Sequence, residues 1–140
     1  MTYILESVDL LALLLTLWDE AEDGYVHWPG TALEAPDPDV GGAWIRPRVQ
    51  SGEAFRVDLG PSNYLTRHTG NFEIQIFTPM DAGPEQALAL VDQLRDGLSD
   101  QRLSPSNVLT RTASARDAGD DGTWAQMNIS VPFQRDRVTP

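Results

Sequence analysis

The chain has 140 residues, a formal net charge of −11 at pH 7 and no cysteine. This length favours a single domain spanning residues 1–140, and the lack of cysteine excludes disulfide bonds and thiolate metal sites. All ten basic residues are arginine. So acidic a chain is a poor candidate for holding a phosphate backbone through its overall electrostatic field.

The acidic residues are distributed unevenly. Residues 1–40 hold nine carboxylates and no arginine, whereas residues 41–140 hold twelve carboxylates and ten arginines. One interpretation is a solvated acidic face that aids solubility, and the other is a surface that meets a basic partner or repels DNA. The candidates for such an acidic lumen or partner-facing surface are Asp19, Glu20, Glu22, Asp23, Glu34, Asp37 and Asp39.

The first predicted element is a helix over residues 7–18, with Ser7 as its N-cap. An apolar stripe repeats at helical spacing and further leucines widen it, so the helix is apolar nearly all round. We therefore expect it to be buried on more than one side, in a thick core or at a subunit interface. The apolar run over residues 10–18 is shorter than the roughly 20 residues that span a bilayer.

Strands are predicted next. A short strand at residues 25–28 leads into a loop rich in proline and glycine, and residues 44–49 then alternate around Pro47, which favours an edge strand or a bulge. A further alternating stretch covers residues 55–59, and turn residues follow at 60–63. Gly70 opens the clearest strand, in which Phe72, Ile74 and Ile76 face one way.

The C-terminal part begins with an amphipathic helix over residues 84–98, with a proline in its first turn. A strand at 107–113, an exposed mobile loop at 114–122, a strong strand at 125–133 and a loose tail at 134–140 follow. Each strand has one apolar face, and two helices are available to cover it. We predict an α+β fold, a two-layer domain whose mostly antiparallel or mixed sheet has two helices packed on one face.

The sequence offers little catalytic chemistry. His27 and His68 lack metal-ligand spacing to another histidine, and no phosphate-binding loop, dinucleotide motif or nucleophile elbow is present. The carboxylate pairs at 37/39 and 120/121 lie in loops rich in proline or glycine, where a solvated turn explains them. We therefore predict no catalytic residue, no metal site and no cofactor.

Tryptophan and arginine are the residues that favour protein interfaces most strongly. A mixed aromatic and cationic stripe near residues 44–56 also resembles single-strand nucleic-acid binders, but no lysine accompanies it. The alternative is that the tryptophans are core residues and the arginines form ordinary surface ion pairs. The candidates for a subunit or tube interface are Trp44, Arg46, Arg48, Arg67 and Trp124.

As a whole, the sequence resembles the tail terminator-like family of siphophages and prophages, a family of minor tail proteins. The resemblance covers about two-thirds of the chain, mainly residues 44–136, and rests on the order and spacing of several segments. These are WIRPRV at 44–49, Gly60, RHTG at 67–70, FEIQIFTP at 72–79, the helix at 83–98, DGTW at 121–124, ISVPFQ at 129–134 and Asp136.

The resemblance implies a structural subunit that forms a hexameric ring on the last ring of the tail tube. Such a ring stops tube growth and provides the surface for head attachment. The implied partners are further copies of the chain, the major tail tube protein and a head-completion or connector protein. DNA would pass through the bore without specific binding, and no membrane is involved. The implied location is the head-proximal end of the virion tail, after assembly in the host cytoplasm.

Three other functions stay open on the sequence. A neck or head-tail connector subunit would also form a ring around DNA, and the order of neighbouring genes would separate it from a terminator. An acidic DNA mimic would need carboxylates spaced like phosphates, although more than half of the chain is nearly charge-balanced. A small enzyme would need a pocket with a perturbed carboxylate.

Overall fold

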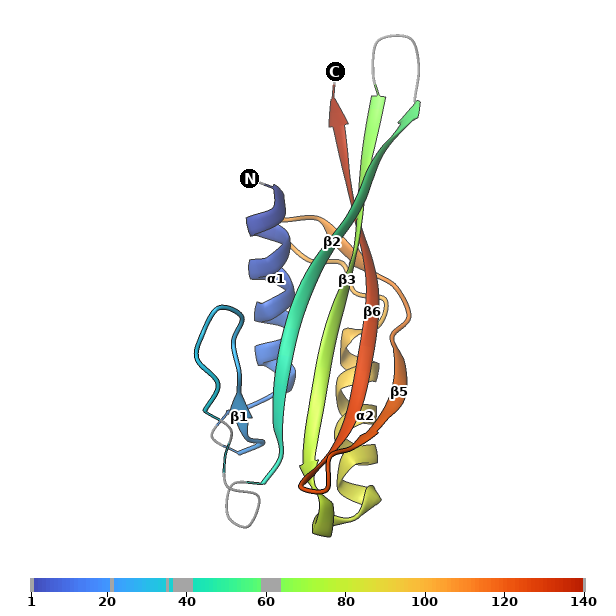
Figure 1. The fold of residues 1–140 in the computed structure, drawn as a ribbon. Coiled ribbons are helices and arrows are strands. Elements are labelled where there is room, and N and C mark those ends of the chain that lie inside the picture. Colours follow the sequence, from blue (N-terminus) through green and yellow to red (C-terminus); the bar gives the residue numbers. More distant parts are fainter. Residues whose placement is uncertain (1, 21, 35, 37–41, 59–63, 140) are drawn as a thin grey trace.

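The computed structural model of the chain describes residues 2–20, 22–34, 36, 42–58 and 64–139. Two helices and six strands follow one another, with a short 3-10 helix before the second helix (Figure 1). In chain order they are α1 (Thr2–Leu17), β1 (Tyr25–Val26), β2 (Trp44–Asp58), β3 (Tyr64–Pro79), η1 (Met80–Ala82), α2 (Pro84–Leu98), β4 (Val108–Thr110), β5 (Ser114–Asp120) and β6 (Trp124–Thr139).

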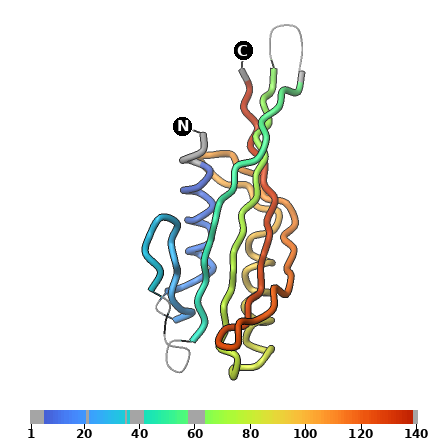
Figure 2. Tube along the Cα trace, viewed as in Figure 1, coloured from blue at the N-terminus to red at the C-terminus, as the bar shows by residue number. Residues whose placement is uncertain are grey.

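The strands form one curved sheet in the order β1-β2-β3-β6-β4, and β5 pairs with β6 beside β4. Only β1 and β2 run parallel, and every other pair is antiparallel. Both helices lie on the same face of this sheet (Figures 1 and 2). The predicted two-layer α+β fold, with two helices on one face of a mixed sheet, is therefore confirmed.

The core lies between the helices and the alternating residues of the central strands. In β3, Phe72, Ile74 and Ile76 are fully buried, while the residues between them face the other side of the sheet. β6 contributes Ile129 and Val131 in direct register with Ile74 and Phe72. The helices complete the core with Leu10 and Leu14 of α1 and Val91, Leu94 and Leu98 of α2.

The leucine-rich helix α1 is covered by its own subunit on one side only. Leu10, Leu14 and Trp18 are buried, but Val8 is 56% exposed and Leu15 is 49% exposed. Its inner side approaches α2 closely, since a Cβ on Gly97 would come within 2.4 Å of the Leu17 side chain. The expectation that α1 is covered on more than one side therefore requires a partner, and the single chain leaves an apolar stripe in solvent.

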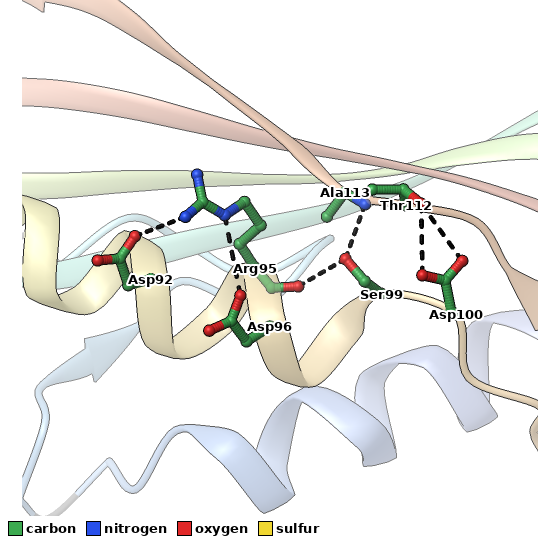
Figure 3. Close-up of polar contacts among 7 residues, drawn as sticks. All are labelled: Asp92, Arg95, Asp96, Ser99, Asp100, Thr112 and Ala113. Carbon is green, nitrogen blue, oxygen red and sulfur yellow. Dashed lines mark hydrogen bonds and ion pairs between the residues drawn. The ribbon is translucent and has the colours of Figure 1, made fainter.

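Polar contacts fix the C-terminal end of α2 to the segment that precedes β5 (Figure 3). The hydroxyl of Ser99 donates to the carbonyl oxygen of Arg95 at 2.7 Å and accepts from the backbone N–H of Ala113 at 2.8 Å. Arg95 also pairs with the carboxylate of Asp92 at 2.7 Å. The hydroxyl of Ser99 thus adds to the bond that its own backbone N–H donates to Arg95, and it gives the N–H of Ala113 an acceptor.

Three strands continue beyond the layer of helices, starting from a base at His68 and Arg135 that lies near Glu6 of α1. Residues 51–58 of β2, 64–69 of β3 and 134–139 of β6 form a three-stranded ribbon, here called the arm (Figures 1 and 2). None of the described side chains of the arm is buried. A ribbon with solvent on both faces gains little from burial, although its strands carry apolar side chains.

The structure corrects four expectations. Helix α1 begins at Thr2, so Ser7 lies inside the helix and is not its N-cap. The stretches at 44–49 and 55–58 belong to one continuous strand, β2, and its bulge between Ser51 and Ala54 interrupts the alternation. Residues 114–120 form strand β5 rather than a loop, because this edge strand is held by pairing with β6 and only Ala115 packs against the core, so its sequence shows no apolar alternation. Residues 134–139 are the end of β6, paired with β3, and not a loose tail. The turn predicted at 60–63 lies outside the described residues.

Candidate assembly surfaces

The face of the sheet that the helices leave uncovered is polar along most of its length. In β3 it shows Asn71, Glu73 and Gln75, which alternate with the buried core residues. Across from them, β6 presents Asn128 and Ser130 in register. Ser130 donates a hydrogen bond from its hydroxyl to the side-chain oxygen of Asn71 at 2.8 Å.

An aromatic cluster closes one end of this open face. Trp44 stacks on Phe77 with ring centroids 4.1 Å apart, contacts Trp124 edge-on at 6.1 Å and lies 6.0 Å from the tilted ring of Tyr25. Trp44 is only 3% exposed, so in the single chain it is a packed residue with little surface for a partner. Trp124 is half-buried at the rim of the cluster.

Arg46 and Arg48 lie next to this cluster on β2. The Nε of Arg46 donates to the side-chain oxygen of Gln75, and the guanidinium lies 5.5 Å from the centroid of Phe77. Arg48 is exposed and stands opposite Glu73 in the strand register. Together they border a hollow of about 330 Å³, lined by His27, Trp28, Pro29, Arg46, Pro47, Arg48, Glu73 and Gln75.

Arg67 lies in the arm, far from the other interface candidates along β3. Its guanidinium pairs with Asp136 on β6 through two hydrogen bonds, Nε to Oδ1 at 2.8 Å and Nη2 to Oδ2 at 3.1 Å. The hydrogen bond from Arg67 is the main reason that the pKa of Asp136 is lowered. The five candidates therefore separate into two groups, four near the aromatic cluster and Arg67 in the arm.

The predicted acidic surface begins where α1 ends. Asp19, Glu20 and Glu22 are exposed there, and the backbone N–H of Asp19 donates to the carboxylate of Asp23 at 2.8 Å. Glu34 is exposed in the following loop. This end of α1 lies opposite to the arm along the length of the molecule (Figure 1). Asp37 and Asp39 lie outside the described residues.

Two buried carboxylates on α1 went unnoticed in the sequence. Glu6 is 3% exposed, and burial raises its pKa while nearby His68 and Arg135 partly oppose that shift. Asp9 is 8% exposed, and its carboxylate accepts the backbone N–H of Ser106 at 2.9 Å. The sequence could have identified them, because they are three residues apart on a helix that was expected to be buried nearly all round.

An apolar groove at the end opposite to the arm was also missed. It has a volume of about 420 Å³, and its exposed side chains include Met80 and Leu88. Sequence patterns could not reveal it because its walls come from five separate elements, β3, η1, α2, β5 and β6. The lining residues are Thr78, Pro79, Met80, Gly83, Pro84, Ala87, Leu88, Asp117, Ala125, Gln126 and Met127.

The described residues contain no group of three or more histidine or acidic side chains that could hold a metal ion. Within the same residues, no helix has the length and apolar character needed to cross a membrane. The side chains gathered on the open face are mostly amides, hydroxyls, aromatics and arginines, with the carboxylate of Glu73 among them. Such groups suit recognition of another protein surface more than proton transfer.

Solved structures share this fold at low sequence identity. One, whose title states no function, has a TM-score of 0.63 at 17% identity, covering 94% of this chain and 96% of the other. Another belongs to the virion of a native gene transfer agent particle, with a TM-score of 0.54 at 14% identity and 93% of each chain covered. No curated protein matches the sequence significantly.

The family assignment rests on the sequence itself. The model of the phage tail terminator protein family matches residues 9–133. The match includes the second half of α1, all of α2 and the body of the sheet. The chain therefore belongs to the phage tail terminator family and has a structural role in the tail of a phage particle.

Proposed function

We propose that the chain forms a closed hexameric ring on the end of the tail tube, stops tube growth and offers the surface to which the head attaches. The observation that carries this proposal is the amount of apolar surface that the single chain leaves uncovered. The stripe of Val8 and Leu15 on α1 and the two-sided arm both lie in solvent. Exposed apolar surface on this scale is typical of subunits that assemble.

A terminator needs two different kinds of contact. Contacts between copies must run head to tail around a rotation axis, so that a ring closes. A separate surface must match the last ring of the tube. In this proposal the exposed stripe of α1 meets the tube protein, and the surface on the opposite side of the ring receives the head-completion protein.

The acidic end of α1 faces the bore in this arrangement. The open face of the sheet is a poor lining for a DNA channel, because Arg46, Arg48 and Arg116 outnumber the acidic Glu73 there. The carboxylates of Asp19, Glu20, Glu22, Asp23 and Glu34 would instead repel phosphate and let the genome slide. An outer-wall position for these carboxylates would contradict this part of the proposal.

The same subunit could serve as a neck connector, which would also be a ring around DNA. We favour the terminator because the family match is to terminators and covers most of the chain. Light scattering over a wide range of concentrations tests the ring. A mass near six times 15.4 kDa supports it, and a mass that stays that of one chain both alone and with tail tubes contradicts it.

A further inference from the structure

The arm carries an apolar side that nothing in its own chain covers. Phe55 is 45% exposed and Val138 is 56% exposed. Val57, Leu65 and Val138 are directly opposite one another in the strand register, and Phe55 lies two residues before Val57 on the same side. The arm therefore presents Phe55, Val57, Leu65 and Val138 on one surface, in a ribbon that has no second layer behind it.

The apolar groove lies at the other end of the same strands. β3 enters the arm at Leu65 and borders the groove at Thr78, a separation of about 40 Å along an extended strand. Figure 1 shows the arm at one end of the molecule and η1, with the start of α2, at the other. A subunit therefore cannot place its own arm in its own groove.

Charge favours the approach of these two surfaces. Arg56 and Arg137 are exposed on the arm, on the side opposite to Phe55. At the groove, Asp117 is a lining residue, and Asp81 and Glu85 are exposed next to lining residues in the chain. The arm holds four arginines and three carboxylates, so its net charge is about +1 in a chain whose net charge is −11. Its two exposed arginines can therefore meet the acidic rim of the groove from the edge of the docked arm, while the apolar side enters the groove.

We infer that the arm of one copy docks in the groove of the next copy, with Phe55 and Val138 against Met80 and Leu88. This inference rests on the proposed ring and names the contact that would close it. The two surfaces differ and lie at opposite ends, so each copy uses one of each and the contact is heterologous. Repeated around an axis, such contacts produce a closed ring and leave neither surface exposed.

Because the natural chain has no cysteine, chemical cross-linking can test this contact cleanly. The double variant Phe55→Cys/Leu88→Cys is treated with a short bismaleimide, as free protein and on purified tail tubes. The expected result is a ladder of covalent oligomers ending at the size of the ring. A mixture of the two single variants should give only a covalent dimer, and each single variant alone should give none.

The matched control is Leu33→Cys/Leu88→Cys, since Leu33 is 51% exposed in a loop away from the arm. It should not form a ladder. The inference is overturned if the Phe55/Leu88 variant gives no ladder in either condition, or if it links to the tube protein instead. The mass of the wild-type chain by light scattering decides separately whether a ring forms, so a wild-type ring without the ladder rejects only this contact.

Discussion

Arg67 and Asp136 stand directly opposite each other on β3 and β6 and form a two-pronged ion pair inside the arm. The pair joins strands that no helix covers, so it holds the arm together where hydrophobic burial is weak. Both residues belong to the segments that resemble the terminator family. If the arm is an assembly element, the pair keeps it in one conformation before the partner binds.

Replacing Arg67 with Met should loosen the arm without unfolding the body. Hydrogen exchange should become faster at backbone amides of residues 64–69 and 134–139 and stay unchanged in the core of β3. Arg95→Met is the matched control, because it removes an exposed ion pair on α2. Equal protection of the arm in Arg67→Met and wild-type protein would contradict this role.

The ion pair of Arg67 and Asp136 also predicts that the arm becomes less stable at low pH. The pKa of Asp136 is lowered in the folded chain, so its stabilising effect is present above the ordinary value of 3.8 and is lost as the pH falls through the lowered value. Hydrogen exchange in the arm should therefore accelerate below about pH 3.8, beyond the intrinsic change in exchange rate. The Asp136→Asn variant should not show this additional acceleration.

Glu6 should have the opposite effect on stability. Burial raises the pKa of Glu6, so the group favours folding at low pH, and this contribution is lost as the pH rises from the ordinary value of 4.5 through the raised value. Glu6→Gln should therefore increase the free energy of unfolding at pH 7. Denaturant unfolding at several pH values between 4 and 8 measures it. A variant less stable than wild type at pH 7 would show that the charged form has a needed partner.

Gly70 should tolerate no side chain. A Cβ at this position would lie 2.5 Å from the ring of Phe133 and 2.6 Å from the backbone oxygen of Gln50. Gly70→Ala should reduce the free energy of unfolding by roughly 1–3 kcal/mol, as overpacking does in other cores. Gly52→Ala is the control, since its nearest contact would be 3.0 Å, and its cost should be smaller in thermal or denaturant unfolding.

Substitutions in the exposed stripe of α1 should abolish tube binding without reducing stability. Val8→Asp/Leu15→Asp should change the free energy of unfolding by less than about 1 kcal/mol, since surface substitutions each have small effects. The same variant should fail to bind tail tubes in a pelleting assay, because the charges replace apolar contact area. Undiminished tube binding would show that this stripe does not meet the tube.

The sequence was sufficient to predict the fold in those segments where buried residues recur at a regular spacing. The alternation at Phe72, Ile74 and Ile76 and the stripe of α2 each predicted one covered face, and both helices were found on that face. Edge strand β5 and the arm parts of β3 and β6 escaped prediction, because their residues lack a clear apolar alternation and only pairing within the sheet reveals them. The alternation at residues 55–58 did predict a strand, which is the arm part of β2.

Prediction of the candidate sites met the same limit, because contacts between distant segments leave no pattern in the local sequence. Composition drew attention to Trp44, but only the structure shows that Phe77, Trp124 and Tyr25 surround it. The groove at Met80 and Leu88 combines five elements, so no local pattern could predict it. The acidic residues before position 40 were predicted as a group, and their place in an assembled ring stays a prediction.

The most direct test of the terminator function is the growth of purified tail tube protein in the presence of the chain, followed by electron microscopy. If the chain is a terminator, tubes stop lengthening and each stopped tube carries a ring of added density at one end. The ring should be absent from tubes grown without the chain. Tubes that reach the same lengths with and without it, and carry no added density, would contradict the proposed function.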